Sequence, residues 1–126
     1  MTTLAHRRTV VVDVCALDDL TPELGAAALV DGRQVALFRL ADGTVHAVDN
    51  ICPYSGAAVV SRGITGSRGE LATVASPVYK QVFDLATGRC LDDVGMSPRP
   101  GRGRDLAVHP VRIHDGRVLL ELRVDA

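Results

Sequence analysis

The side chains best suited to chemistry lie in two short stretches of the sequence. Asn50–Gly63 reads NICPYSGAAVVSRG, and Ala75–Cys90 reads ASPVYKQVFDLATGRC. Each stretch has a small residue followed directly by a proline, with a tyrosine within three positions. A thiol is a soft metal ligand, whereas a phenol or a hydroxyl binds iron–sulfur centres poorly and hydrogen-bonds well. The four residues concerned are Cys52, Tyr54, Ser76 and Tyr79.

The spacing of these four positions resembles that of the two cluster-binding loops of a Rieske iron–sulfur domain. In that family the first loop reads Cys-x-His and the second Cys-x-x-His, so that two thiolates hold one iron and two imidazoles hold the other. Here only Cys52 is a possible ligand, and one thiolate cannot hold a [2Fe–2S] cluster. The resemblance implies an all-β, Rieske-like fold with degenerate cluster positions, no metal-binding residues and no cofactor of its own.

Tyr54 and Tyr79 are the only tyrosines of the chain, and both occupy former histidine positions. One hypothesis is that the two phenols and the Ser76 hydroxyl are buried and hydrogen-bond across the space that a cluster would fill. The alternative is that one or both rings point outward and anchor a partner protein, a role in which tyrosine is enriched.

The rest of the sequence offers no convincing catalytic residues. There is no GxSxG motif, and the glycines of Gly63–Gly69 are not followed by the Lys-Ser/Thr of a phosphate-binding loop. The histidines lack ligand spacing and are expected to be structural: His6, His46, His109 and His114. The cysteines Cys15, Cys52 and Cys90 are expected to be reduced thiols, with a Cys52–Cys90 disulfide as the alternative.

Length and composition indicate a single globular domain over residues 1–126, with a core of about 9–124. Hydrophobic residues make up 47% of the chain and charged residues 23%. The net charge of −1 argues against general attraction to nucleic acid or to acidic membranes. No apolar run approaches the ~20 residues that span a bilayer, and the N-terminus has no secretory leader pattern. We therefore expect a cytoplasmic protein.

Short β-branched runs separated by turn residues predict an antiparallel sandwich or barrel with the two loops at one end. Asp31-Gly32 and Asp115-Gly116 are strong hairpin signals, and one helical turn is expected within Leu17–Leu24. The predicted strands are Thr9–Val14, Ala26–Val30, Arg33–Leu40, Thr44–Val48, Leu71–Ala75, Val82–Leu85, Ala107–His114 and Arg117–Val124.

The segment Gly95–Arg104 (GMSPRPGRGR) combines proline, glycine and three arginines. One interpretation is a solvated, mobile loop, which such compositions usually form. The other is a cationic contact for an acidic partner or a phosphate.

Three segments together resemble the small subunit of assimilatory NAD(P)H-dependent nitrite reductase: SRG at Ser61–Gly63, VASPVYKQVFDLATGRCLDD at Val74–Asp93, and PVRIHDGRVLLEL at Pro110–Leu122. This resemblance implies a subunit of an oxidoreductase that reduces nitrite to ammonium in nitrate assimilation. It implies the large subunit as partner, carrying FAD, a [4Fe–4S] cluster and siroheme, while this chain alone is not catalytic.

A Rieske loop tip normally faces the redox partner, so the interface is expected near Tyr54–Ala58 and Val78–Gln81. Arg62 and Lys80 are the candidate charged contacts there. Two other functions stay open at this stage. One is a Rieske-type ferredoxin that transfers electrons through an atypical iron site. The other is an orphan Rieske-like binding module that acts outside nitrogen metabolism.

Overall fold

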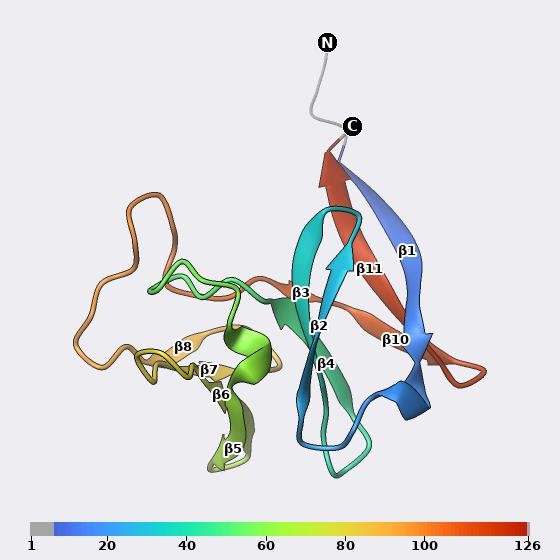
Figure 1. The fold of residues 1–126 in the computed structure, drawn as a ribbon, viewed down its shortest axis with the longest axis horizontal. Helices are drawn as coiled ribbons and strands as arrows, with labels where there is room; N and C mark the ends of the chain where they lie inside the picture. The colour runs from blue at the N-terminus through green and yellow to red at the C-terminus, as the bar shows by residue number, and fades with distance from the viewer. Residues whose placement is uncertain (1–6, 126) are drawn as a thin grey trace.

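The protein folds into strands and loops, as the sequence predicts (Figure 1). The structure is a computed structural model that describes residues 7–125. His6 and the residues before it, which begin the stretch considered for a leader peptide, lie outside the described residues. Strands form three antiparallel sheets, and two 3-10 turns, η1 (Leu17–Asp19) and η2 (Val60–Arg62), connect them. Between residues 7 and 125, no helix has the length and apolar character needed to cross a bilayer.

The three sheets lie in layers (Figure 1). The first sheet has the strand order β1-β11-β10, the central one β2-β3-β4-β9, and the third β5-β6-β7-β8. Their bounds are β1 (Arg7–Ala16), β2 (Gly25–Val30), β3 (Arg33–Arg39), β4 (Val45–Asp49), β5 (Ile64–Arg68), β6 (Leu71–Ala75), β7 (Val82–Asp84), β8 (Cys90–Asp92), β9 (Val108–His109), β10 (Val111–His114) and β11 (Arg117–Asp125).

The central sheet is covered on both faces, and this explains the continuous apolar run in β3. Side chains alternate across a strand. Val35 and Leu37 accordingly pack with the first sheet, in a cluster that includes Leu120. Ala36 and Phe38 point the other way, into a second cluster built with the third sheet and its loops. The third sheet and its loops are therefore supported directly by the central strands.

The two Asp-Gly pairs form the hairpin turns that the sequence predicts. Asp31 and Gly32 have φ values of 51° and 80° and connect β2 with β3. Asp115 and Gly116 have φ values of 50° and 73° and connect β10 with β11. Positive φ at both central residues matches the twist of the flanking strands, and Asp and Gly tolerate it best. The predicted β2-β3-β4 meander and the short turn after β1 are confirmed as well.

The structure corrects the prediction of one continuous strand over Ala107–His114. Pro110 divides it into β9, which pairs with β4 in the central sheet, and β10, which pairs with β11 in the first sheet. Proline has no N–H to donate to a ladder, so the chain changes sheets at that residue. Two strands were not predicted. β5 is an edge strand with two mostly exposed faces, and β8 has only three residues, so neither leaves a clear hydrophobic pattern in the sequence.

Candidate functional site

The two loops singled out in the sequence adopt the same six-residue conformation. In the first loop (Cys52–Ala57), the Cys52 N–H donates to the Ala57 carbonyl at 2.9 Å, and the Gly56 N–H donates to the Cys52 carbonyl at 2.8 Å. In the second loop (Ser76–Gln81), the Ser76 N–H donates to the Gln81 carbonyl at 2.8 Å, and the Lys80 N–H donates to the Ser76 carbonyl at 3.0 Å. Each loop is thus closed by its own backbone.

This correspondence places Cys52 and Ser76 at equivalent positions, each just before a proline. Cys52 is 0% exposed and Ser76 is 2% exposed. The fifth residue of each loop has a positive φ, which is 74° for Gly56 and 66° for Lys80. The Ser76 hydroxyl has no hydrogen-bond partner within the described chain. The two loops therefore keep a matched geometry although their side chains differ.

Asn50 fixes the start of the first loop. Its buried side-chain oxygen accepts a hydrogen bond from the Ser61 N–H at 2.7 Å, and its carbonyl accepts one from the Val60 N–H at 3.0 Å. These bonds hold η2 against the strand end that leads into Cys52. Gly63, which follows η2, has an ordinary φ of −71°. A Cβ there would overlap the Ala75 carbonyl oxygen, so Gly63 serves close packing rather than the tight turn that glycine usually provides.

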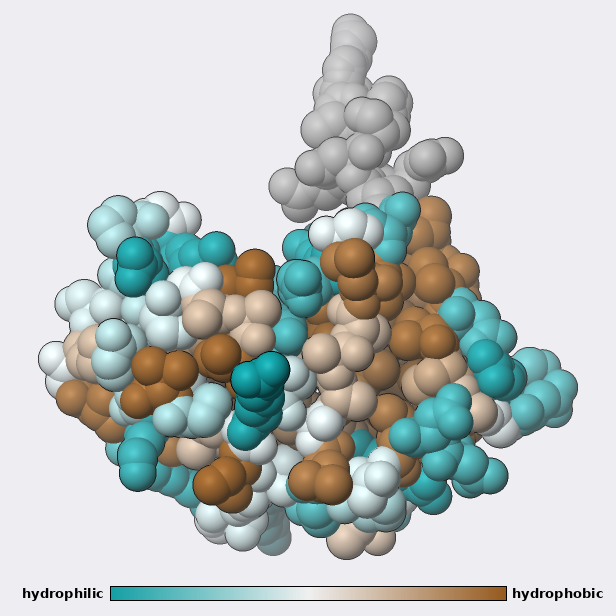
Figure 2. All heavy atoms as spheres, viewed as in Figure 1, coloured by the Kyte–Doolittle hydropathy of each residue, from teal (hydrophilic) through white to brown (hydrophobic). Residues whose placement is uncertain are grey.

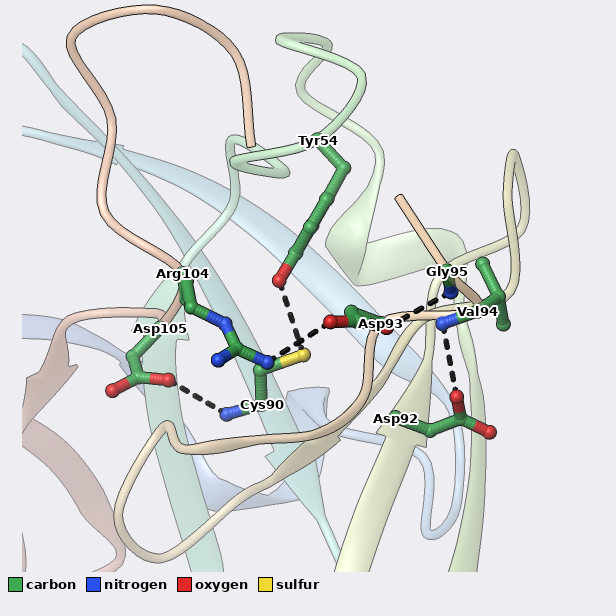
Figure 3. Close-up of polar contacts among 8 residues, drawn as sticks. All are labelled: Tyr54, Cys90, Asp92, Asp93, Val94, Gly95, Arg104 and Asp105. Atoms are coloured by element: carbon green, nitrogen blue, oxygen red, sulfur yellow. Dashed lines mark hydrogen bonds and ion pairs between the residues drawn. The ribbon is translucent and has the colours of Figure 1, made fainter. Parts of the chain in front are cut away.

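Tyr54 points from the first loop into the interior and is 3% exposed. Its hydroxyl donates a hydrogen bond to the Cys90 sulfur at 3.3 Å (Figure 3). Its ring lies 6.2 Å from the ring of Phe83 on β7 at an angle of 48°. The phenol therefore links the first loop to the third sheet.

The surroundings of Tyr54 favour the neutral phenol. Burial and the hydrogen bond to Cys90 raise the pKa of Tyr54 to about 12. The Arg104 guanidinium lies beside the hydroxyl and acts in the opposite direction on this pKa (Figure 3). Arg104 also forms an ion pair with Asp93 at 3.0 Å, and Asp105 accepts the Cys90 N–H at 2.8 Å. Tyr54 thus belongs to a small polar network at the edge of the core.

Tyr79 does not join Tyr54, and the hypothesis of a buried pair of phenols is wrong. Tyr79 is 44% exposed, and its neighbour Val78 is 45% exposed. The reason lies in the loop register. Tyr54 is the third residue of its loop, whereas Tyr79 is the fourth residue of the other, so equivalent backbones direct the two rings differently. The outward alternative fits Tyr79, and the inward one fits Tyr54.

The arginine loop (Gly95–Arg104) contacts both six-residue loops. The Arg99 N–H donates to the Pro53 carbonyl at 2.9 Å, and its guanidinium donates to the Ser55 carbonyl at 3.3 Å. On the other side, the Gln81 amide donates to the Met96 sulfur at 3.4 Å. The segment is therefore held by hydrogen bonds to both six-residue loops, unlike the solvated, mobile loop that its composition suggests.

The residues at the four predicted cluster positions do not fit a [2Fe–2S] cluster. Cys52 offers one thiol and Ser76 a hydroxyl. The Tyr54 hydroxyl is hydrogen-bonded to Cys90, and Tyr79 faces outward. A Rieske centre requires two thiolates and two imidazoles. Within residues 7–125, no three or more His, Cys, Asp or Glu side chains gather closely enough to hold a metal ion. Cys15, Cys52 and Cys90 are free thiols, as predicted, so the alternative Cys52–Cys90 disulfide is not formed.

The three described histidines lie on strands, where the sequence placed them. His46 lies on β4, and burial lowers its pKa. His109, on β9, is buried and pairs through Nε2 with Asp49 at 2.8 Å. This pair joins β9 to the end of β4, and sequence reasoning missed it because 60 residues separate the partners. His114 is exposed on β10.

The comparisons with known proteins agree with this geometry. The family model described as a Rieske-like [2Fe-2S] domain matches residues 11–121. The nitrite reductase (NADH) small subunit of Escherichia coli K12 is 39% identical over 110 residues, covering 86% of this chain and 94% of that protein. This chain belongs to the nitrite reductase small-subunit family.

Two further relatives of the family are informative. One is a crystal structure from Mycobacterium tuberculosis of a protein proposed to be an NADH-dependent nitrite reductase small subunit. It is 49% identical, with a TM-score of 0.79 and coverage of 91% of this chain and 96% of that one. The other is a nitrite reductase [NAD(P)H] large subunit of Klebsiella oxytoca, 38% identical over 105 residues. The match covers 83% of this chain but 10% of that longer protein. The all-β Rieske-like fold class is thereby confirmed.

Proposed function

We propose that this chain is the small, non-catalytic subunit of a cytoplasmic NAD(P)H-dependent nitrite reductase that acts in nitrate assimilation. Its partner is the large subunit, which carries FAD, a [4Fe–4S] cluster and siroheme and reduces nitrite to ammonium. Membership of the nitrite reductase small-subunit family supports this assignment. The Klebsiella oxytoca large subunit supports the partner, because a stretch of that polypeptide resembles 83% of this chain.

The observation that carries the non-catalytic role is the pair of matched loops without a matching ligand set. The same pair of backbone hydrogen bonds closes both loops, yet their buried residues include Cys52, Tyr54 and Ser76. The matched loop shape without the matching ligands supports a subunit that does not itself transfer electrons. The subunit then acts by binding, and it orders the large subunit or shapes access to it.

The proposed interface lies at the tips of the two loops, near Tyr54–Ala58 and Val78–Gln81. Among these residues, the exposed Val78 and Tyr79 offer apolar area at the tip of the second loop. A specific heterodimer of this kind buries roughly 1,200–2,000 Å² in total. Tyrosine is among the side chains that contribute most to such interfaces.

Co-expression with a nitrite reductase large subunit tests this function. We expect a complex that survives gel filtration and a gain in nitrite-reducing activity over the large subunit alone. An iron and sulfide assay of the purified small subunit is the second measurement. Stoichiometric iron and sulfide would favour a Rieske-type ferredoxin instead. Absence of both complex and activity gain would favour a binding module that acts elsewhere.

A further inference from the structure

Charge is distributed unevenly along this nearly neutral chain. The first loop with η2 (residues 50–63), the second loop (residues 76–81) and the arginine-containing segment 94–104 carry five of the chain's 14 basic residues. They carry none of its 15 acidic residues. These basic residues are Arg62, Lys80, Arg99, Arg102 and Arg104.

The three segments come together in space although they are far apart in sequence. Arg99 donates to carbonyls of the first loop, and Met96 accepts a hydrogen bond from Gln81 of the second. A Cβ at Gly56 would meet the Arg99 side chain at 3.0 Å, which shows how closely the arginine loop covers the first loop. The three segments form one end of the molecule, on the left in Figure 1. We refer to it as the loop end.

Most of the positive charge at the loop end is not neutralised within the described part of the chain. Arg104 pairs with Asp93 at 3.0 Å. Lys80, Arg99 and Arg102 are exposed and form no ion pair with described residues. The hydrogen bond from Arg99 to the Ser55 carbonyl fixes the guanidinium without cancelling its charge.

Exposed apolar side chains adjoin one of these cations, Lys80. Val78 and Tyr79 directly precede Lys80 at the tip of the second loop. Figure 2 shows hydrophobic and hydrophilic residues intermingled over the lobe formed by β5–β8 and its loops. An apolar centre with charged residues beside it is the usual composition of a specific protein interface.

We propose that the loop end is a cationic docking surface that binds an acidic patch on the nitrite reductase large subunit. Val78 and Tyr79 form its apolar centre, and Lys80, Arg99 and Arg102 supply its charge. This inference rests on the proposed function and adds the chemistry of the partner's surface. Complementary charges of this kind set the association rate and orientation of two proteins, and salt weakens them. A nucleic acid is not favoured as occupant, because the chain as a whole has a net charge of −1.

The test compares two double variants in the complex with the co-expressed large subunit. Lys80→Glu/Arg102→Glu reverses two charges of the loop end and spares Arg99, which fastens the loops. Arg89→Glu/Arg112→Glu changes the net charge equally, at exposed residues of the β7–β8 turn and of β10. We expect the first variant to weaken the complex roughly tenfold or more and the control to leave it nearly unchanged. For the wild type, raising salt from ~0.1 M to ~1 M shortens the screening length from about 10 to about 3 Å and weakens binding.

A second pair of variants tests the apolar centre of the loop end. Tyr79→Ala removes a ring at the loop end that is 44% exposed, and the control Leu29→Ala removes a more exposed apolar side chain on β2, at 68%. We expect only Tyr79→Ala to weaken the complex. A stable complex that neither salt nor either loop-end variant affects would overturn this inference and leave the proposed function intact. Failure to form any complex at low salt would contradict the proposed function itself. Retention of the wild type on nucleic acid but not on the large subunit would overturn the acidic-protein assignment.

Discussion

The hydroxyl of Tyr54 lies 3.3 Å from the sulfur of Cys90 and donates a hydrogen bond to it (Figure 3). The two residues are 36 positions apart, on the first loop and on β8. The Rieske resemblance predicts that this position corresponds to a histidine that binds iron. Here the same position connects loop and sheet through an internal contact between two side chains. A hydrogen bond between two side chains of the same chain thus supports the loop, in the role that metal coordination has in a Rieske centre.

Replacing Tyr54 by phenylalanine tests the strength of this link. Tyr54→Phe keeps the ring beside Phe83 and removes only the hydroxyl, with its bond to Cys90 and its contact with Arg104. We expect the free energy of unfolding of the isolated chain to fall by about 0.5–1.5 kcal/mol, measured by urea denaturation. Tyr79→Phe is the matched control, because that ring is 44% exposed. Equal losses in the two variants would contradict the inward role of Tyr54.

The raised pKa of Tyr54 predicts a loss of stability at alkaline pH. The folded chain holds the phenolic proton more tightly than the unfolded chain, whose tyrosines ionise near ~10. This stabilisation is complete below the unfolded value and is lost as the pH rises towards the folded pKa of about 12. Tyrosinate absorbance measured during the titration reports the ionisation directly. The Tyr54→Phe variant should lack the transition near 12, and an ionisation of Tyr54 near ~10 would refute the effect of burial.

The equivalent loop positions Gly56 and Lys80 predict different responses to substitution. Both have positive φ, and a Cβ at Gly56 would also press on Arg99 at 3.0 Å. Gly56→Ala should lower the free energy of unfolding by about 1–2 kcal/mol, because alanine is strained in this conformation. Lys80→Gly should be nearly neutral, since relief of strain is offset by the greater backbone entropy of glycine when unfolded. Thermal denaturation of both variants compares them, and a larger loss for Lys80→Gly would contradict the assignment.

Asn50 is expected to be the main polar support of the first loop. Asn50→Ala leaves the N–H of Ser61 without its acceptor at a site where Ser61 is 8% exposed. An orphaned buried donor costs about 1–3 kcal/mol, so the free energy of unfolding should fall by that amount. Hydrogen exchange at the Ser61 amide should accelerate as well. Ser67→Ala on the exposed β5 is the control and should change stability by less than ~0.5 kcal/mol.

His46 predicts a loss of stability in acid. Burial is the largest cause of its lowered pKa, and the nearby carboxylates of Asp42 and Asp84 oppose it in part. Because the folded chain binds this proton less readily than the unfolded chain, stability is full above the unfolded pKa of ~6.5. It decreases as the pH falls through the lower folded value. His46→Gln should flatten this part of the stability profile measured by denaturation at stepped pH. An unchanged profile would show that His46 is not responsible.

The sequence alone determined features that depend on residue types and on short stretches of the chain. The Asp-Gly turns at Asp31 and Asp115 were predictable because positive φ is allowed by the residue itself. The all-β class followed from short apolar runs between such turns. The prediction that the cluster ligands are missing also rests on residue types, since one thiol among four positions cannot replace two thiolates and two imidazoles.

The tertiary structure decided which way the side chains of the two loops point. Tyr54 faces Cys90 and Tyr79 faces solvent because the two residues occupy different positions, third and fourth, in two loops of the same conformation. The arginine loop lies over the first loop because Arg99 finds two carbonyls there, 44 and 46 positions earlier in the chain. Such contacts depend on how three sheets pack, and residues so far apart in sequence leave no local pattern that could predict them.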